Sequence, residues 1–279
     1  MLAVVLLQGC STIKLAYNQS PDLTYWWLDG YVDFNGQQTP KVRDGIAALF
    51  AWHRSNELPK VAAWLQKGQA LMPQNITAAQ ACSLYDEARG MVNTIADNAL
   101  PALVEWAPTV TPDQLLALQK KQKKTIDEFS SDFITSTPAQ RNAKRVKSAI
   151  SRSEMVYGKL EATQIAAIEK FVATSSFDPA LVVKERVQRQ KEGVDMLRKL
   201  ADTKPAPAAV QATLRAYITR STTSPDPIYR AYAETIVREG CESFAAVHAT
   251  TTPAQRTKAV QTLRGYEQDV RTLSGQNGS

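Results

Sequence analysis

The sequence predicts an all-α fold, a multi-helix bundle of about ten helices with short capped connections and no sheet. Three observations predict it. Apolar residues recur every three or four positions, as in Val42, Ile46, Leu49 and Phe50, which is the spacing of one buried helical face. The alternating pattern of a half-buried strand is missing from the sequence. Proline repeatedly follows Thr, Ser or Asp, a pair that marks the first turn of a helix.

Helical periodicity predicts ten segments in chain order. They are residues 40–55, 59–72, 77–99, 112–134, 138–157, 161–173, 179–200, 206–220, 226–248 and 253–273. A cap residue followed by proline marks six starts: Thr39, Thr111, Thr137, Asp178, Ser224 and Thr252. With 279 residues and 44% hydrophobic content, the chain can build a sizeable core. We expect a single helical domain over residues 21–273 and a disordered tail over 274–279.

The first ten residues, MLAVVLLQGC, have the pattern of a lipoprotein export signal, an apolar run followed by Leu7-Gln8-Gly9-Cys10. The run is shorter than the ~20 apolar residues of a membrane-spanning helix, and it lacks the positive start of a full signal. We therefore expect a truncated signal peptide over 1–9, lipidation of Cys10, and a tether over 10–20. The competing interpretation is a short buried strand or the start of a helix.

Acylation of Cys10 would place the protein in the bacterial cell envelope, lipid-anchored. Ser11 follows the cysteine, and the sorting rule of many Gram-negative bacteria then favours the outer membrane, with the body facing the periplasm. The expected partners are the membrane through its lipid, envelope proteins, peptidoglycan or anionic glycolipid. A net charge of +6 suits anionic partners. The envelope address excludes nucleic acid.

Two further cysteines, Cys82 and Cys241, are a candidate disulfide in an oxidising compartment. The alternative is that both are small, reduced, buried residues on helices.

Basic residues concentrate in two consecutive helices, at 119–124 and 141–152. Such runs are usually a solvated face. Facing each other across a helical hairpin, they would instead form a surface for an anionic partner. The candidate residues for this patch are Arg141, Lys144, Arg145 and Lys147.

Four helix starts carry a Thr-x-x-Gln pattern: Thr77–Gln80, Thr111–Gln114, Thr137–Gln140 and Thr252–Gln255. Each predicts a capping box, in which the threonine and glutamine side chains bind each other's backbone amides. The pattern also resembles the Leu-Thr-x-x-Gln motif of the periplasmic helical chaperones of the Spy and CpxP kind. That resemblance implies a basic, concave dimer that holds unfolding clients.

The segment LAYNQSPDLTYWWLDGYVDF, residues 15–34, resembles the opening of a bacterial lipoprotein family classed as a domain of unknown function. The matching positions are Cys10, Tyr17, Asn18, Tyr25, Trp26, Trp27, Leu28, Asp29, Tyr31, Asp33 and Phe34. Residues 152–160 are similar to the central segment of the same family. The resemblance implies an exported helical lipoprotein and supplies no activity.

The aromatic segment itself has three interpretations. We expect Leu23, Trp26, Trp27, Leu28 and Tyr31 to pack inward. Alternatively the rings lie at a lipid interface, or they form a sugar-binding shelf with Asp29 or Asp33.

Catalytic, metal and cofactor motifs are not found in the sequence, and none is predicted. His53 and His248 lack the spacing of metal ligands and are expected to be surface or half-buried residues. Glu105 and Glu154 are the carboxylates set among apolar or aromatic neighbours, as a single acid-base glutamate would be. We expect a binding or chaperone-like envelope-maintenance factor. The alternative is a peptidoglycan- or glycan-acting envelope protein.

Overall fold

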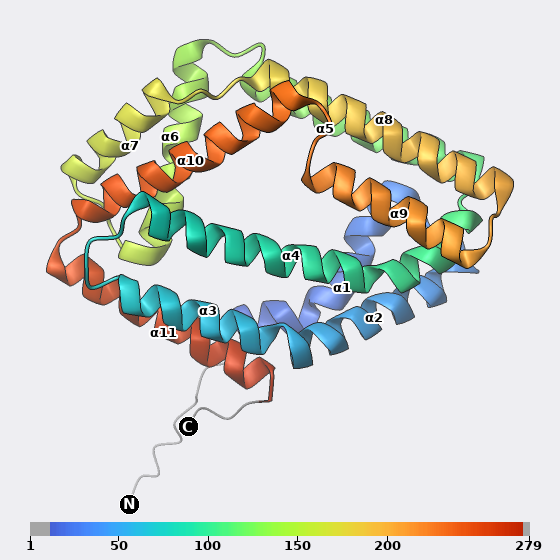
Figure 1. Cartoon of the computed structure of the whole chain (residues 1–279), viewed down its shortest axis with the longest axis horizontal. Helices are drawn as coiled ribbons and strands as arrows, with labels where there is room; N and C mark the ends of the chain where they lie inside the picture. The colour runs from blue at the N-terminus through green and yellow to red at the C-terminus, as the bar shows by residue number, and fades with distance from the viewer. Residues whose placement is uncertain (1–11, 276–279) are drawn as a thin grey trace, which may run out of the picture.

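The computed structural model describes residues 12–275 as an arrangement of helices (Figure 1). They form eleven α-helices, one short 3-10 helix and no strand. In chain order these are α1 (Thr12–Val32), α2 (Gln38–Asn56), α3 (Leu58–Leu71), α4 (Ala78–Trp106), η1 (Ala107–Thr109), α5 (Pro112–Phe133), α6 (Pro138–Tyr157), α7 (Ala162–Thr174), α8 (Pro179–Thr203), α9 (Pro207–Thr222), α10 (Pro227–Ala249) and α11 (Pro253–Leu273). The predicted all-α fold is confirmed. Among these helices none is both long enough and apolar enough to cross a membrane.

Helix boundaries differ from the sequence prediction mainly at the N-terminal end. Helix α1 begins at Thr12 and continues through Pro21, so the segment expected to be a tether up to residue 20 is helical from residue 12. Helix α4 likewise continues through Pro101 to Trp106. The expected signal peptide and residues 276–279 of the expected tail lie outside the described part of the chain.

The caps follow local chemistry with two exceptions. All four predicted Thr-x-x-Gln capping boxes are confirmed, at α4, α5, α6 and α11. Thr39 is not a cap, because α2 already begins at Gln38 and the Thr39 hydroxyl instead donates to the Asn35 carbonyl. Ser224 is not a cap either. The α10 cap is Asp226, whose carboxylate accepts the first amide hydrogens of the helix.

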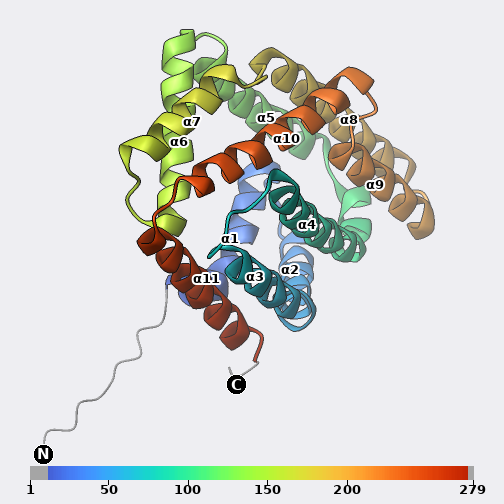
Figure 2. The ribbon, with the colours of Figure 1, turned by 60° about the vertical axis from the view of Figure 1, so that its left-hand side comes forward.

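The helices pack as two related halves, α1–α5 and α6–α11. In the first half α1 packs against α2 and α5, and α2 against α4; in the second, α6 packs against α7 and α11, and α7 against α10. The two halves also contact each other, since α3 packs along α11 and α5 along α8 (Figures 1 and 2). Each half therefore completes its packing with helices of the other.

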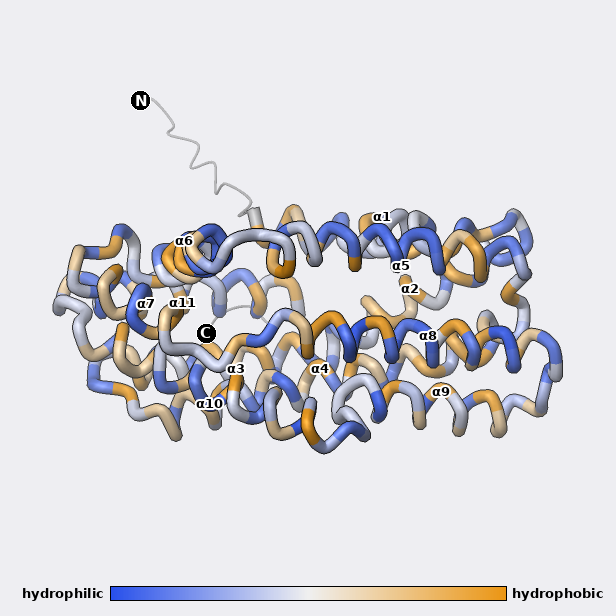
Figure 3. Tube along the Cα trace, turned by 90° about the horizontal axis from the view of Figure 1, so that it is seen from above, coloured by the Kyte–Doolittle hydropathy of each residue, from blue (hydrophilic) through white to orange (hydrophobic). Residues whose placement is uncertain are grey.

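Apolar side chains gather in three clusters, and each cluster joins the two halves. One lies between α4, η1 and α5 of the first half and α8 and α9 of the second. Another joins α3 to α11, and the third joins the end of α3 to α6, α7, α10 and α11. A disulfide between Cys82 of α4 and Cys241 of α10, with the two Cα atoms 5.4 Å apart, adds a covalent link. Seen along its edge, the molecule places α1, α5 and α6 on one side and α4, α9 and α10 on the other (Figure 3).

Candidate functional site

Each half of the molecule contains a pair of buried glutamines whose side chains are hydrogen-bonded to each other. In the first half, Gln38 at the start of α2 and Gln114 in the first turn of α5 each donate Nε2–H to the other's Oε1, at 3.1 and 2.6 Å. In the second half, Gln164 of α7 and Gln255 of α11 do the same, at 2.7 and 2.9 Å. All four side chains are between 0% and 8% exposed. We call each pair a glutamine clasp.

The two clasps donate hydrogen bonds to backbone carbonyls at matching positions of the two halves. Gln38 donates to the Thr109 carbonyl and Gln164 to the Thr250 carbonyl, each at 3.0 Å. Gln114 donates to the Asp33 carbonyl at 2.9 Å, and Gln255 to the Lys159 carbonyl at 3.0 Å. Because the same bonds recur at matching chain positions, the two halves are an internal repeat. Counting back from Gln114 and Gln255 pairs Leu103 with Phe244 and Trp106 with Val247.

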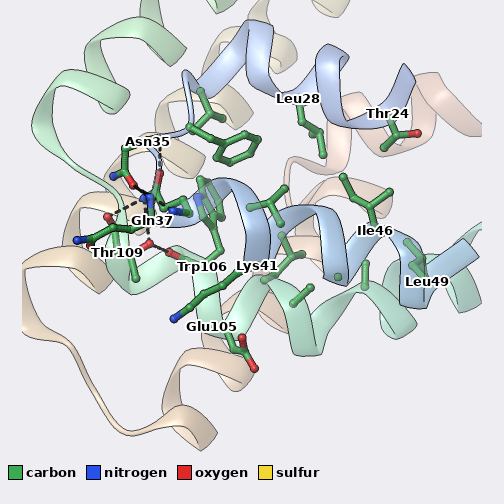
Figure 4. Close-up of a pocket in the computed structure, with 18 of the residues that line it drawn as sticks. Thr24, Leu28, Asn35, Gln37, Lys41, Ile46, Leu49, Glu105, Trp106 and Thr109 are labelled. Carbon is green, nitrogen blue, oxygen red and sulfur yellow. Dashed lines mark hydrogen bonds between the residues drawn. The ribbon is translucent and has the colours of Figure 1, made fainter. Parts of the chain in front are cut away.

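A cavity of about 420 Å³ lies beside the first clasp, between α1, α2 and α4 (Figure 4). This volume falls within the ~300–1,000 Å³ of small-molecule sites. Its walls are mainly apolar and come from all three helices. The apolar lining residues are Leu28, Val32, Phe34, Val42, Ile46, Leu49, Ala99, Ala102, Leu103 and Trp106.

Polar side chains lie at both ends of this cavity, with Thr24 at the end away from the clasp (Figure 4). Asn35 and Thr109 lie at the clasp end, away from Ile46 and Leu49 (Figure 4). The Trp106 Nε1–H is buried and has no hydrogen-bond partner among the described residues. An unmatched buried donor costs about 1–3 kcal/mol, and an acceptor atom on a bound molecule would relieve that cost if the Trp106 ring turned its Nε1–H toward the cavity.

Two side chains of opposite charge lie at the solvent-exposed edge of this cavity. Lys41 of α2 and Glu105 of α4 line it and are exposed to solvent. The site therefore combines an apolar interior with a polar rim, which is the general make-up of a ligand site.

A close helix crossing shapes the cavity wall. A Cβ atom built on Gly45 would lie 2.6 Å from the Cβ of Ala102, so α2 and α4 approach each other at this point only because Gly45 has no side chain. Both residues line the cavity.

The positions that match Leu103 and Trp106 are packed in the second half. Phe244 and Val247 of α10 pack with Ile168 of α7 and Ile150 of α6. Their counterparts Leu103 and Trp106 also pack against a cluster and in addition line the cavity. His248 lies beside the second-half cluster, fully buried, with its ring stacked on Phe244 at 6.1 Å. The wall that Leu103 and Trp106 of α4 give to the cavity therefore has no counterpart in the second half, where a hollow between α6 and α7 is lined by Ile150 and Val172.

His248 is fully buried. The expectation from the sequence, a surface or half-buried residue, is wrong for this histidine. Its Nε2–H donates to the Gln74 carbonyl at 2.6 Å, and its Nδ1 lies within hydrogen-bond distance of the Tyr157 hydroxyl, at 2.9 Å. Burial lowers the pKa of His248 below its ordinary value and raises the pKa of Tyr157. His53 is half-buried as expected, bonded to the Tyr17 hydroxyl at 2.8 Å, and burial lowers its pKa as well.

The four residues of the expected anionic-partner patch have different environments. Arg145 is half-buried, donates to the Val172 carbonyl, and lies 4.6 Å from the Phe177 ring. Arg141 donates to the Phe133 carbonyl at 2.7 Å. Lys144 is exposed and pairs with Asp132 at 2.5 Å, and Lys147 is exposed. Arg145 and Arg141 thus hold α6 to its neighbours, because each satisfies a backbone carbonyl, and only the two lysines lie open on the surface.

The aromatic segment packs through a different face from the one expected. Leu23, Trp26 and Trp27 are 52%, 60% and 63% exposed, while Tyr25 and Val32 are buried. The Tyr25 hydroxyl bonds Thr39 of α2 at 3.0 Å, and the Arg43 guanidinium lies 3.8 Å from its ring. Packing against α2 therefore selects Tyr25 over the neighbouring tryptophans.

The remaining candidates are placed as follows. Cys10 lies outside the described residues. Glu154 is exposed and accepts the Leu160 amide hydrogen at 3.3 Å. Within residues 12–275 no three His, Cys, Asp or Glu side chains gather as a metal-ligand set.

No pattern in the sequence identified Trp106 as a cavity residue or Gln38 and Gln164 as clasp partners. The signal available was the Thr-x-x-Gln pattern, which explained Gln114 and Gln255 as caps but did not reveal that a second glutamine faces each of them.

Searches of curated proteins and of solved structures each returned no match for this chain. A family model, described as a family of unknown function, matches residues 30–219. This stretch contains the first clasp and most of the cavity, and it is more than half of the sequence. The chain therefore belongs to the family of unknown function DUF6279.

Proposed function

We propose that this protein is a lipid-anchored envelope protein that works by binding, and that the cavity beside the first clasp is its ligand site. The ligand class is a molecule with an apolar chain and an acceptor oxygen at one end, such as a fatty acyl ester. The chain would occupy the space between α1, α2 and α4, and the oxygen would accept the Trp106 Nε1–H.

The observation that carries the proposal is an apolar cavity with the Trp106 side chain in its wall, together with the unmatched Nε1–H of that side chain. A well-packed interior leaves few voids larger than a water molecule, and at the position that matches Trp106 the second half has Val247, which is 4% exposed within a packed cluster. The first half keeps a void and, on a side chain that lines it, an unsatisfied donor, which is an arrangement that a ligand would complete.

The envelope address rests on two separate supports. The Leu7–Cys10 pattern is that of a lipoprotein signal. A disulfide joins Cys82 to Cys241, and disulfides persist mainly in oxidising compartments such as the periplasm.

Binding of 11-(dansylamino)undecanoic acid, followed by dansyl fluorescence, tests the cavity. Ala99→Phe places a ring into the lined space, and Ala47→Phe is the matched control, since Ala47 lies exposed on α2. We expect Ala99→Phe to lower affinity about tenfold or more and Ala47→Phe to leave it unchanged. Equal affinity for both variants would overturn the site.

A second comparison tests the role of Trp106. Trp106→Phe keeps an apolar ring and removes the donor. We expect it to weaken binding of a methyl ester of a fatty acid by about 2- to 10-fold, the value of one hydrogen bond, and to leave binding of the matching alkane unchanged. An equal loss for ester and alkane would show that Trp106 only shapes the cavity.

Holding an unfolding polypeptide is the second candidate function. It is supported by the confirmed Thr-x-x-Gln caps and by the two-half arrangement, which parallels the dimer that the chaperone resemblance implies. Suppression of the aggregation of a reduced client protein tests it. Suppression that Ala99→Phe leaves intact would assign this activity to a surface other than the cavity.

A further inference from the structure

The outward side of α1 is an exposed apolar surface. Leu15, Leu23, Trp26 and Trp27 are between 52% and 63% exposed. At 3.6 residues per turn, these four share an arc of about 120° on the helix. The arc also contains Ala16, Gln19 and Gly30, which are exposed as well. It contains no charged residue, and we call it the outer arc.

The opposite side of α1 is also apolar, and it is the side that packs. Tyr25 and Val32 are 7% exposed against the body of the protein. A helix on a protein surface normally turns a polar side to solvent. A contiguous apolar surface with large rings marks an interaction site. The outer arc therefore needs a partner that α2 and α5 do not supply.

Basic side chains adjoin the outer arc. Helix α5 packs against α1, and the Lys121 Nζ lies 5.3 Å from the centre of the Tyr31 ring. That ring in turn lies 5.0 Å from Trp27. Lys120, which directly precedes Lys121 in the sequence, is exposed. An apolar stripe with tryptophans beside lysines is the pattern of a helix that lies in the interface of an anionic membrane.

The position of α1 in the chain favours the same partner. Cys10 precedes Thr12 by two residues, and two residues of chain span about 7 Å at most. An acyl chain on Cys10 would therefore hold the start of α1 at the bilayer surface. The side that α1 shares with α5 and α6 (Figure 3) would then face the lipid.

We propose that the outer arc docks on an anionic phospholipid bilayer, with α1 parallel to the surface and Trp26 and Trp27 at the level of the head groups. Tryptophan prefers this depth because its ring is apolar while its N–H is polar. The contact does not depend on the lipid at Cys10, which would only add to it. It is also separate from the ligand cavity, which lies under the opposite side of α1.

The test measures binding of the full chain to vesicles in a Cys10→Ala background, so that no acyl chain contributes. Vesicles of phosphatidylethanolamine with phosphatidylglycerol are compared with vesicles of phosphatidylcholine by co-sedimentation. The test variant is W26Q/W27Q. The matched control is V92Q/I228Q, whose side chains are 62% and 65% exposed on α4 and α10, on the opposite side of the molecule (Figure 3).

We expect W26Q/W27Q to lower the partition coefficient on anionic vesicles about tenfold or more, and V92Q/I228Q to leave it unchanged. Added salt and neutral vesicles should both weaken wild-type binding. Because all four positions are exposed, both double variants should keep the thermal unfolding midpoint of the wild type.

Equal partition coefficients for the two double variants would overturn the proposal. So would loss of client-aggregation suppression in W26Q/W27Q with unchanged vesicle binding, since the partner would then be an unfolded polypeptide. A change from dimer to monomer in W26Q/W27Q would instead identify a second copy of the chain as the partner. Ala99→Phe should bind vesicles normally, so the cavity and the outer arc can fail independently.

Discussion

The glutamine clasp of the second half gives the sharpest stability prediction. The Gln255 Oε1 accepts the Thr252 amide hydrogen at 3.0 Å and the Gln164 Nε2–H at 2.7 Å. Its Nε2 donates to the Lys159 carbonyl at 3.0 Å and to the Gln164 Oε1 at 2.9 Å. Gln255→Leu keeps the side-chain size and removes all four bonds at once.

The magnitude follows from the burial of these groups. A buried polar group that loses its partner costs about 1–3 kcal/mol. Gln255→Leu leaves the Lys159 carbonyl without its side-chain donor, and it leaves the Gln164 amide with only its bonds to the Thr250 carbonyl and the Glu161 amide hydrogen. We expect it to lower the free energy of unfolding by about 3–4 kcal/mol. Gln164→Leu should cost a similar amount.

The double variant Q164L/Q255L should cost about 2 kcal/mol less than the sum of the two single variants. Each single variant leaves the other glutamine buried with one partner fewer at both its Oε1 and its Nε2, whereas the double variant removes both amides together. Urea unfolding followed by circular dichroism measures all three free energies.

Gln140→Leu is the matched control, because Gln140 caps α6 in the same Thr-x-x-Gln pattern but is exposed and faces no second glutamine in the described structure. It should cost about 1 kcal/mol or less. The reasoning is refuted if Gln255→Leu costs no more than this control, or if the costs of the two clasp variants add.

Three further changes test other parts of the fold. Replacing Cys82 and Cys241 by serine should lower the free energy of unfolding by about 5 kcal/mol in the chain-entropy model, given the sequence separation of 159 residues; equal urea midpoints with and without the disulfide would contradict this. Gly45→Ala should destabilise by about 1–3 kcal/mol because its Cβ meets α4, whereas Gly90→Ala, with open space around it, should stabilise by about 1 kcal/mol. Because burial lowers the pKa of His248, the unfolded chain takes up its proton at a higher pH than the folded chain. Stability should thus be complete above about pH 6.5 and fall as the pH drops through the lower pKa of the folded state, and His248→Asn should flatten that dependence in urea unfolding.

The sequence predicted what local contacts determine. A Thr-x-x-Gln cap forms between residues three apart, so Thr77, Thr111, Thr137 and Thr252 could be identified without knowing the tertiary structure. The clasp joins Gln38 to a residue 76 positions away. No periodicity encodes such a pairing, and for this reason the repeat that the clasps reveal was not predicted.

Helix α1 shows a second limit of sequence patterns. It carries apolar residues on two sides, so helical spacing cannot tell which side is buried. The choice comes from α2, where Thr39 and Arg43 contact Tyr25 and leave Trp26 outside. Tertiary neighbours also determine the burial of Arg145 on the basic helix α6, where its guanidinium bonds the Val172 carbonyl and lies over the Phe177 ring.

The cavity can be tested by giving one half the residue that the other half has at the matching position. At the position where the first half has Leu103, the second half has Phe244, and its ring packs in the core there. Leu103→Phe should therefore fill the cavity with a side chain that the repeated fold already accommodates, and lower affinity for the dansyl fatty acid about tenfold or more with less than about 1.5 kcal/mol lost in stability. Phe244→Leu should destabilise the fold instead, because it removes a ring stacked on His248 and leaves a void. If Leu103→Phe binds the probe as the wild type does, the probe occupies another site, and the cavity is only a packing defect of the first half.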